Sequence, residues 1–309
     1  METVGCNLCE GRSAKPAYQL TDLLLERLDT QVILVKCDTC GLVYQNPRPT
    51  MEEIGAYYPP EYESYQPLSG QKKLPWLLGK AYQYGTDKRC RIVTRLQQNG
   101  GRLLDVGCAT GNFLMGMKRL PNWELYGVEP NEHAARVAQE NGLNVFVGVL
   151  EQARYPDNFF DAVTLWDVLE HLHDPKTSLK EIFRILKPGG LLVVRVPNLD
   201  SWDAGIFRRA WAGLDAPRHL YVFDRRTLSQ ILEQAGLRVK YLRSEIGSYP
   251  TFVLSVRFWL VQTGVHEGVR QAILHVLLHS IARILFAPFF YVYSLNSRGP
   301  LVTASAIKG

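Results

Sequence analysis

The sequence predicts an α/β fold with a doubly wound, mostly parallel sheet, preceded by a small N-terminal module. From residue 76 onwards, short apolar segments alternate with segments of helical periodicity, as they do in βαβ units. A glycine turn follows the first apolar segment at residues 107–111, and two Cys-x-x-Cys pairs precede residue 50. A chain of 309 residues is long enough for one large core and one small appended module.

The cysteines of the N-terminal module have the spacing of a metal site. Each two-residue spacer lets a tight turn direct both thiolates at one ion, so two such pairs predict a closed, tetrahedral, structural Zn²⁺ site. The 27 residues between the pairs would form a helix at 22–28 and a strand at 31–36. Unmetallated surface thiols and a redox-active pair are the alternatives. The predicted zinc ligands are Cys6, Cys9, Cys37 and Cys40.

Prolines between residues 47 and 75 mark the boundary between an N-terminal module and the main domain. Residues 1–50 form the zinc-ribbon-like module, and residues 51–75 are a proline-containing linker. The tyrosines of the linker would cover a substrate entrance or clamp the two parts together. The main domain spans residues 76–309, starts with a helix at 75–98 and contains a helical insertion at about 246–298.

The glycine turn at the end of the first strand is typical of a ligand-binding loop. Glycine permits positive φ and a close approach of the backbone to a ligand. The G-x-G-x-x-G fingerprint of nicotinamide cofactors is absent, because Ala109 and Asn112 occupy its second and third glycine positions. The spacing fits acidic-x-Gly-x-Gly-x-Gly instead, with Ala109 in the middle position. The candidate binding residues of this stretch are Asp105, Gly107, Cys108, Ala109 and Gly111.

The second strand, at 123–128, ends in an acidic residue. Glu129 is followed by Pro130, and an acidic side chain at this place can accept both hydroxyls of a ribose. Together with segments 160–166 and 186–194, the series resembles the class I S-adenosylmethionine (SAM)-dependent methyltransferases over roughly residues 76–245. The final strand of that Rossmann-like fold is expected near 300–307. A doubly wound domain that binds another nucleotide is the alternative.

The resemblance implies a role in SAM binding for each of these residues. The glycine turn and Asp105 would shape the methionine end, Glu129 the ribose, and Trp166 or Asp167 the remaining wall. The family commonly has an acidic residue just after the third strand that contacts the adenine. Val149 stands at that position here, so Glu151 or backbone amides would make the adenine contact.

The loop after the fourth strand is expected to border the cofactor and the acceptor. His171 or His173 could take a proton from an acceptor hydroxyl, because imidazole titrates near neutral pH. A divalent metal on Asp167, Glu170 and His171 is an alternative, as some quinone O-methyltransferases with a similar loop use. Purely structural hydrogen bonds within the loop are the third interpretation.

Residues 197–222 are rich in aromatic and basic side chains and lie where the family builds its acceptor pocket. His219, in a segment resembling the Pro-x-His-x-x-x-Phe segment of many members, is the second candidate base. Arg218 could pair with an anionic acceptor such as a carboxylate or phosphate. The alternatives are a histidine bonded within its own loop and an arginine stacked on Trp211.

The helical insertion is unusual for the family. Gln271, His275, His279 and Arg283 recur every four residues, which predicts a helix with a narrow polar stripe and a wide apolar face. Arg283 interrupts an apolar run already too short to span a bilayer. We favour packing on the same domain or on a second subunit as a homodimer, over peripheral contact with a membrane.

The sequence therefore predicts a SAM-dependent methyltransferase that modifies a small-molecule, sugar or glycolipid/quinone-like acceptor, with O-methylation as the first choice. Sugar C-methylation is the rival, because the cysteine module with Asn46-Pro47-Arg48-Pro49-Thr50 resembles that of bacterial methyltransferases acting on sugars. A non-catalytic SAM-binding subunit is a third hypothesis. RNA methylation is disfavoured, because the net charge of +5 is modest and spread along the chain. With no export signal at the N-terminus, we expect a cytoplasmic protein, with contact at the inner face of the membrane as the alternative.

Overall fold

The computed structural model describes residues 1–59, 76–244, 249–279, 282, 284–286, 288, 290 and 298–309. Its main domain contains a seven-stranded sheet in the order β10-β11-β8-β7-β4-β5-β6. The strands β8, β7, β4, β5 and β6 are parallel to one another, and β11 runs antiparallel to both β8 and β10. The predicted doubly wound, mostly parallel fold is confirmed. The strands are β4 (Gly101–Val106), β5 (Trp123–Glu129), β6 (Asn144–Val147), β7 (Phe160–Trp166), β8 (Leu186–Pro197), β10 (Leu237–Ser244) and β11 (Leu301–Lys308).

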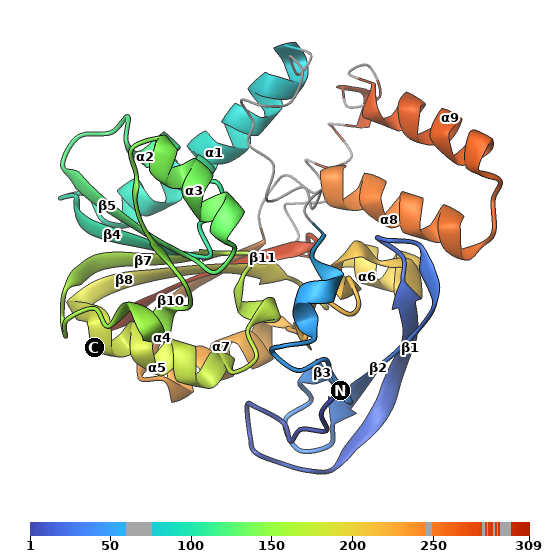
Figure 1. Cartoon of the computed structure of the whole chain (residues 1–309), viewed down its shortest axis with the longest axis horizontal. Coiled ribbons are helices and arrows are strands. Elements are labelled where there is room, and N and C mark those ends of the chain that lie inside the picture. Colours follow the sequence, from blue (N-terminus) through green and yellow to red (C-terminus); the bar gives the residue numbers. More distant parts are fainter. Residues whose placement is uncertain are drawn as a thin grey trace.

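Helices cover both faces of this sheet (Figure 1). Because both faces are covered, most residues of β7 and β8 are buried and apolar, as expected for central parallel strands. On one face lie α1 (Trp76–Leu96), α2 (Asn112–Met117) and α3 (Glu132–Glu140), and on the other lie α4 (Leu150–Ala153), α5 (Pro175–Ile185) and α7 (Arg225–Gln234).

Aspartate side chains cap the starts of α5 and α7. The side chain of Asp174 accepts a hydrogen bond from the backbone N of Thr177 at 3.1 Å, and Pro175 occupies the first turn of α5. The side chain of Asp224 accepts from the backbone N of Thr227 at 2.6 Å. Each cap satisfies a backbone donor that the first helical turn leaves unpaired.

The N-terminal module is a four-stranded antiparallel sheet in the order β1-β2-β3-β9. Its strands are β1 (Ala14–Asp22), β2 (Arg27–Cys37), β3 (Val43–Gln45) and β9 (Tyr221–Val222). The last strand comes from the predicted acceptor region of the main domain. The module is therefore joined to that region through backbone pairing as well as through the linker.

The predicted helix at residues 22–28 is wrong, because the chain makes the tight turn of the β1–β2 hairpin there. Asp22 pairs with Arg27 across the hairpin, and the Asp22 carboxylate accepts a hydrogen bond from the backbone N of Leu25 at 3.1 Å. Glu26 has a φ of +55°, which a helix cannot contain. The predicted strand at 31–36 is present as part of β2.

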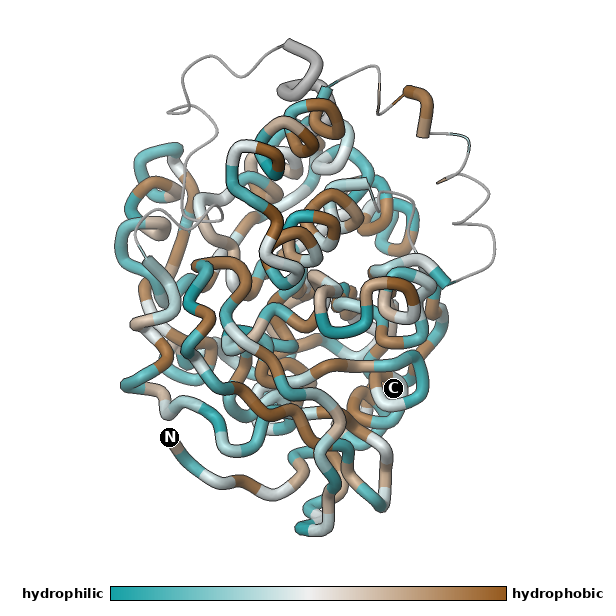
Figure 2. The backbone as a smooth tube through the Cα atoms, turned by 90° about the vertical axis from the view of Figure 1, so that its right-hand side faces the viewer, coloured by the Kyte–Doolittle hydropathy of each residue, from teal (hydrophilic) through white to brown (hydrophobic). Residues whose placement is uncertain are grey.

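The described part of the insertion includes the helices α8 (Tyr249–Gln262) and α9 (Glu267–Leu278), on the side of the molecule that Figure 2 faces. Phe258 and Val261 of α8 pack with Leu23 of the hairpin and with Ala210 and Ala212 of the predicted acceptor region. The polar stripe is only partly described: α9 ends at Leu278, and Arg283 lies outside the described residues. No described helix has the length and apolarity needed to cross a membrane.

Candidate active site

The glycine turn between β4 and α2 depends on backbone conformations that side chains disfavour. Gly107 has a φ of +70° and Gly111 a φ of +81°. A Cβ on Gly107 would lie 2.6 Å from Cγ2 of Val168, and a Cβ on Gly111 would lie 2.3 Å from Cδ1 of Leu143. Both positions therefore need glycine for packing as well as for φ. Ala109, which replaces the middle glycine of the pattern, keeps a positive φ of +48°.

Glu129 holds this turn against the start of α3. Its side chain is 4% exposed. One carboxylate oxygen accepts from the backbone N of Ala109 at 2.9 Å, and the other accepts from the backbone N of Asn131 at 2.8 Å. Burial raises the pKa of Glu129, and these two hydrogen bonds oppose the rise. Each oxygen keeps a further lone pair, so the carboxylate can also accept from ligand hydroxyls.

Asp105 lies at the end of β4, beneath the turn. It is 3% exposed, and its Oδ1 accepts a hydrogen bond from Oγ1 of Thr164 at 2.6 Å. Burial raises the pKa of Asp105 to about 7, although the Thr164 hydrogen bond and the charge of Arg89 act in the opposite direction. A cationic ligand beside Asp105 would therefore favour its charged form.

An aromatic and charged wall stands at the end of β7. The Trp166 side chain is buried, and the guanidinium carbons of Arg89 and Arg195 lie 5.9 and 5.4 Å from its ring centroid. Asp167, with a φ of +59°, forms an ion pair with Arg195, whose Nε lies 3.0 and 3.1 Å from the two carboxylate oxygens. Sequence reasoning missed Arg195, although a single charge within an apolar strand was a signal.

The other three predicted cofactor residues lie in different environments. Cys108 is buried within the turn, and Pro130 is exposed just before α3. Glu151 is exposed on α4, and its carboxylate accepts a hydrogen bond from Oγ of Ser178 on α5 at 2.6 Å. The adenine contact of Glu151 stays a prediction, and a ligand would have to share this carboxylate with Ser178.

Glu170, His171 and His219 meet at the carboxyl end of β7. Glu170 and His171 lie on a short helical turn, η3 (Leu169–His171), and His219 comes from the loop before β9. One potential ligand atom from each residue lies within 4.8 Å of those of the other two. The two imidazole rings are edge to face, with centroids 4.6 Å apart. The structure thus brings both predicted catalytic histidines together.

The hydrogen bonds of the histidines indicate where their protons lie. Nδ1 of His171 is 3.0 Å from the carbonyl oxygen of Arg218 and 2.8 Å from the hydroxyl of Tyr58. Nδ1 of His219 is 2.9 Å from the carbonyl oxygen of Gly213. A carbonyl oxygen can only accept, so these contacts place the ring proton on Nδ1 in both residues and leave Nε2 as the acceptor.

Burial governs the charges of this cluster. Burial lowers the pKa of His171 to about 3, helped by the neighbouring His219, and burial also lowers the pKa of His219. Both imidazoles are therefore uncharged at neutral pH. Glu170 is 0% exposed and its pKa is raised by burial. His173, the other predicted base, lies outside the cluster.

Arg218 does not have the predicted role of pairing with an anionic acceptor. It is 0% exposed, and its guanidinium donates to Asp22 at 2.7 and 3.1 Å and to Asp215 at 2.7 and 3.0 Å. That prediction is wrong because the carboxylates of Asp22 and Asp215 and the carbonyl oxygen of Tyr57 at 3.3 Å already occupy the guanidinium. Asp22 lies at the hairpin of the N-terminal module, so Arg218 connects that module to the loop that carries His219.

The four cysteines of the N-terminal module form one cluster, with all four Sγ atoms within 4.8 Å of one another. The Sγ atoms of Cys6 and Cys40 are 3.4 Å apart, and those of Cys9 and Cys37 are 3.5 Å apart. In a tetrahedral site with Zn–S bonds of about 2.3 Å, the sulfur atoms are about 3.8 Å apart. The thiols therefore fit a zinc ion after a small outward adjustment.

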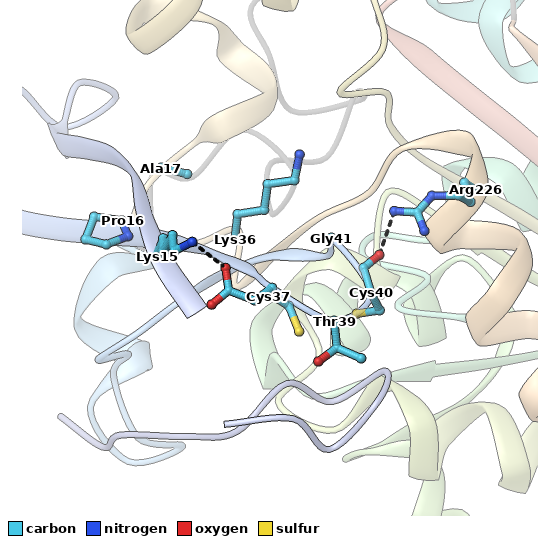
Figure 3. A pocket seen from close by; sticks show the side chains of 10 residues that line it. Lys15, Pro16, Ala17, Lys36, Cys37, Thr39, Cys40, Gly41 and Arg226 are labelled. Carbon is cyan, nitrogen blue, oxygen red and sulfur yellow. Dashed lines mark hydrogen bonds and ion pairs between the residues drawn. The ribbon is translucent and has the colours of Figure 1, made fainter. Parts of the chain in front are cut away.

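An open pocket of about 460 Å³ adjoins the second cysteine pair (Figure 3). Lys15, Lys36 and Arg226 line it, and Arg226 donates a hydrogen bond to the carbonyl oxygen of Cys40 at 2.6 Å. This contact fastens the second Cys-x-x-Cys turn to the start of α7. The glycine turn contributes no residue to this pocket.

Comparison with known proteins identifies the family. Residues 82–242, more than half of the chain, match a family described as a methyltransferase domain. An uncharacterized methyltransferase of Schizosaccharomyces pombe is 35% identical over 139 residues, which cover 40% of this chain and 50% of that protein. The ubiquinone/menaquinone biosynthesis C-methyltransferase UbiE of Burkholderia mallei is 28% identical over 195 residues, covering 53% of this chain and 80% of that protein.

A solved structure shares the fold. It is a SAM-dependent methyltransferase of Thermotoga maritima, described as a possible histamine N-methyltransferase. The likeness has a TM-score of 0.50 at 20% identity and covers 76% of this chain and 93% of that one. The matched domain, the sheet order and the glycine turn agree, and the chain belongs to the class I SAM-dependent methyltransferases.

Proposed function

We propose that this enzyme transfers the SAM methyl group to an oxygen of a small-molecule acceptor, which is a sugar or quinone-like compound, free or lipid-linked. The proposal depends on the edge-to-face pair of imidazoles at the carboxyl edge of the sheet, the part-buried His171 and the buried His219. A hydroxyl that attacks a methyl group must lose its proton, and a neutral imidazole nitrogen can accept a hydrogen bond from it. Both histidines are therefore proposed to contact the acceptor.

The reaction is an in-line displacement. The acceptor oxygen forms a bond to the methyl carbon while the carbon–sulfur bond breaks, and its electron pair stays on sulfur in S-adenosylhomocysteine. Because the sulfonium is already activated, the protein mainly aligns the two reactants. In the proposed arrangement, Asp105 and the glycine turn hold the methionine end of SAM and Glu129 holds the ribose. Trp166 and Asp167 form the wall beside the methyl group.

Carbon methylation is the second candidate, and the match to a quinone C-methyltransferase favours it. Removing a proton from a phenol or enol makes the neighbouring carbon nucleophilic, so the same histidines could serve either outcome. The two products differ in the bond that holds the new methyl group.

We also propose that the four-cysteine cluster binds a structural Zn²⁺ ion. Four thiolates fill a tetrahedral shell and leave no position for a substrate. The position of the cluster supports a structural role, because Arg226 and the β3–β9 pairing join the module to the main domain. The ion would thus stabilise the surface on which the His219 loop rests.

The test of the proposed function is the chemical position of the methyl group in the product. Purified enzyme is incubated with isotope-labelled SAM and a panel of sugar and quinone-like acceptors, and the product is examined by NMR. We expect the labelled methyl to have the chemical shift of a methyl ether. A methyl group on carbon would replace the proposal by the second candidate. His219→Gln should reduce the yield of this product, because His219 is proposed to contact the acceptor. His133→Gln on α3, an exposed histidine outside the cluster, is its matched control.

A further inference from the structure

Glu170 has an unusual environment for a carboxyl group. It is 0% exposed, and within the described part of the chain neither carboxyl oxygen has a hydrogen-bond partner. Burying a carboxylate without a partner is strongly unfavourable, so native proteins pair such groups or bind an ion with them. The Glu170 carboxyl is therefore either protonated or balanced by a bound cation.

The neighbours of Glu170 are suited to hold a cation. His171 and His219 each bring a potential ligand atom within 4.8 Å of the Glu170 carboxyl. Each histidine donates its Nδ1 proton to a backbone carbonyl, that of Arg218 at 3.0 Å and that of Gly213 at 2.9 Å. Histidines that bind metals through one nitrogen commonly donate the other ring N–H to a carbonyl, which fixes the tautomer and the ring orientation.

We propose that Glu170, His171 and His219 bind a first-row divalent transition-metal ion. Two imidazoles and one carboxylate form a ligand set that leaves coordination positions open. Metal–nitrogen bonds of about 2.0–2.1 Å place ligand atoms about 3–4 Å apart, so small side-chain rotations close the site. Asp167, which the sequence offered as a third ligand, is instead held by Arg195 at 3.0 and 3.1 Å.

The inference deepens the proposed function and, in its catalytic part, rests on it. With the ion bound, Nε2 of each histidine would be a metal ligand, so the ion would replace the imidazoles as the group that contacts the acceptor. An acceptor hydroxyl bound at an open position of the ion would have a lowered pKa and release its proton to solvent. The oxygen lone pair would then form the bond to the methyl carbon, and the carbon–sulfur electron pair would stay on sulfur. The ion keeps its oxidation state throughout.

The test uses Mn²⁺, which prefers oxygen and nitrogen donors and competes poorly with zinc for thiolates. The full-length protein, loaded with zinc and free of acceptor, is titrated with Mn²⁺, and free Mn²⁺ is counted by electron paramagnetic resonance. We expect the wild type to bind one Mn²⁺, and Glu170→Gln and His219→Gln to weaken this binding by more than about 100-fold. His173→Gln is the matched control, because His173 Nε2 is 3.0 Å from the carbonyl oxygen of Pro49, outside the cluster.

Two further measurements keep the outcomes distinct. SAM affinity reports whether each variant is folded. The second measurement needs no variant: the melting temperature of the wild type should rise when Mn²⁺ is added. Absence of Mn²⁺ binding by folded wild type, or equal binding by Glu170→Gln, overturns the metal site and leaves the proposed O-methylation standing. Mn²⁺ binding in an enzyme that methylates carbon instead supports the site and overturns the proposed function.

Discussion

Asp22→Asn should destabilise the protein strongly, because Asp22 is half of a buried ion pair. Arg218 and Asp22 are both 0% exposed, and two hydrogen bonds of 2.7 and 3.1 Å join their side chains. The substitution keeps the shape of the side chain and one acceptor oxygen, but it removes the charge that faces the guanidinium. Asp215 alone then balances Arg218.

The expected loss in the free energy of unfolding follows from the burial of the Asp22–Arg218 ion pair. Removing one partner of a buried ion pair costs about 3–5 kcal/mol, because the other charge is left uncompensated. The amide oxygen of asparagine retains one acceptor, so we expect the lower end, about 3 kcal/mol, or about a 100-fold change in the unfolding equilibrium. A typical domain has about 5–15 kcal/mol of total stability, so this loss is large.

The assay is urea unfolding of zinc-loaded protein at neutral pH, with the free energy of unfolding extrapolated to water. The matched control is Glu26→Gln in the same hairpin, whose carboxylate pairs with Arg257 at 3.3 Å and Arg270 at 3.1 Å. That carboxylate is 38% exposed, so its loss should cost no more than about 1 kcal/mol. Equal losses in Asp22→Asn and Glu26→Gln would refute the reasoning about the buried pair.

Three further predictions concern the cofactor, the pH and the zinc. Glu129→Gln should weaken SAM binding about tenfold or more in calorimetry, because hydrogen bonds to a charged group contribute about 1.5–3 kcal/mol; unchanged affinity would contradict the proposed ribose site. Burial tends to raise the pKa of Asp215, but the charge of Arg218 outweighs burial, so the pKa of Asp215 is lowered in the folded protein. The Asp215 carboxylate therefore contributes its full stabilisation above the unfolded pKa of about 3.9, and this contribution disappears as the pH falls through the lower folded pKa. Unfolding free energies measured down an acid series should therefore converge for wild type and Asp215→Asn at the lowest pH, and a constant difference would count against this. Cys37→Ser should abolish retained zinc and lower the melting temperature, whereas Cys90→Ser on α1 should keep the zinc; metal analysis separates the two.

The local pattern of the sequence was enough to predict the sheet and the cofactor turn. Apolar strands, glycine turns and the acid after the second strand are neighbours in sequence, and Glu129 reaches the turn through Ala109 at 2.9 Å. The error at residues 22–28 had a physical cause, since the side chain of Asp22 caps a turn instead of a helix. Helix α8 was not singled out, because its residues are apolar on most sides and show no periodicity.

The roles that the sequence did not reveal depend on contacts between distant segments. Asp22 and Arg218 are 196 positions apart in the chain, and no local periodicity predicts that they pair. The meeting of Glu170 with His219 likewise depends on how the loop before β9 folds against η3. Candidate residues could be named from motifs, but their partners required the three-dimensional arrangement.

The central claim, methyl transfer to a small-molecule acceptor, is tested most directly by following the methyl group. Purified enzyme and SAM with a labelled methyl group are incubated with a host-cell extract, and lipid, glycan, small-molecule, RNA and protein fractions are separated. We predict label in the lipid, glycan or small-molecule fraction, and a strong reduction with Glu129→Gln. Label in RNA or protein would contradict the proposed acceptor. Bound SAM with no label in any fraction would contradict catalysis and favour a SAM-binding subunit.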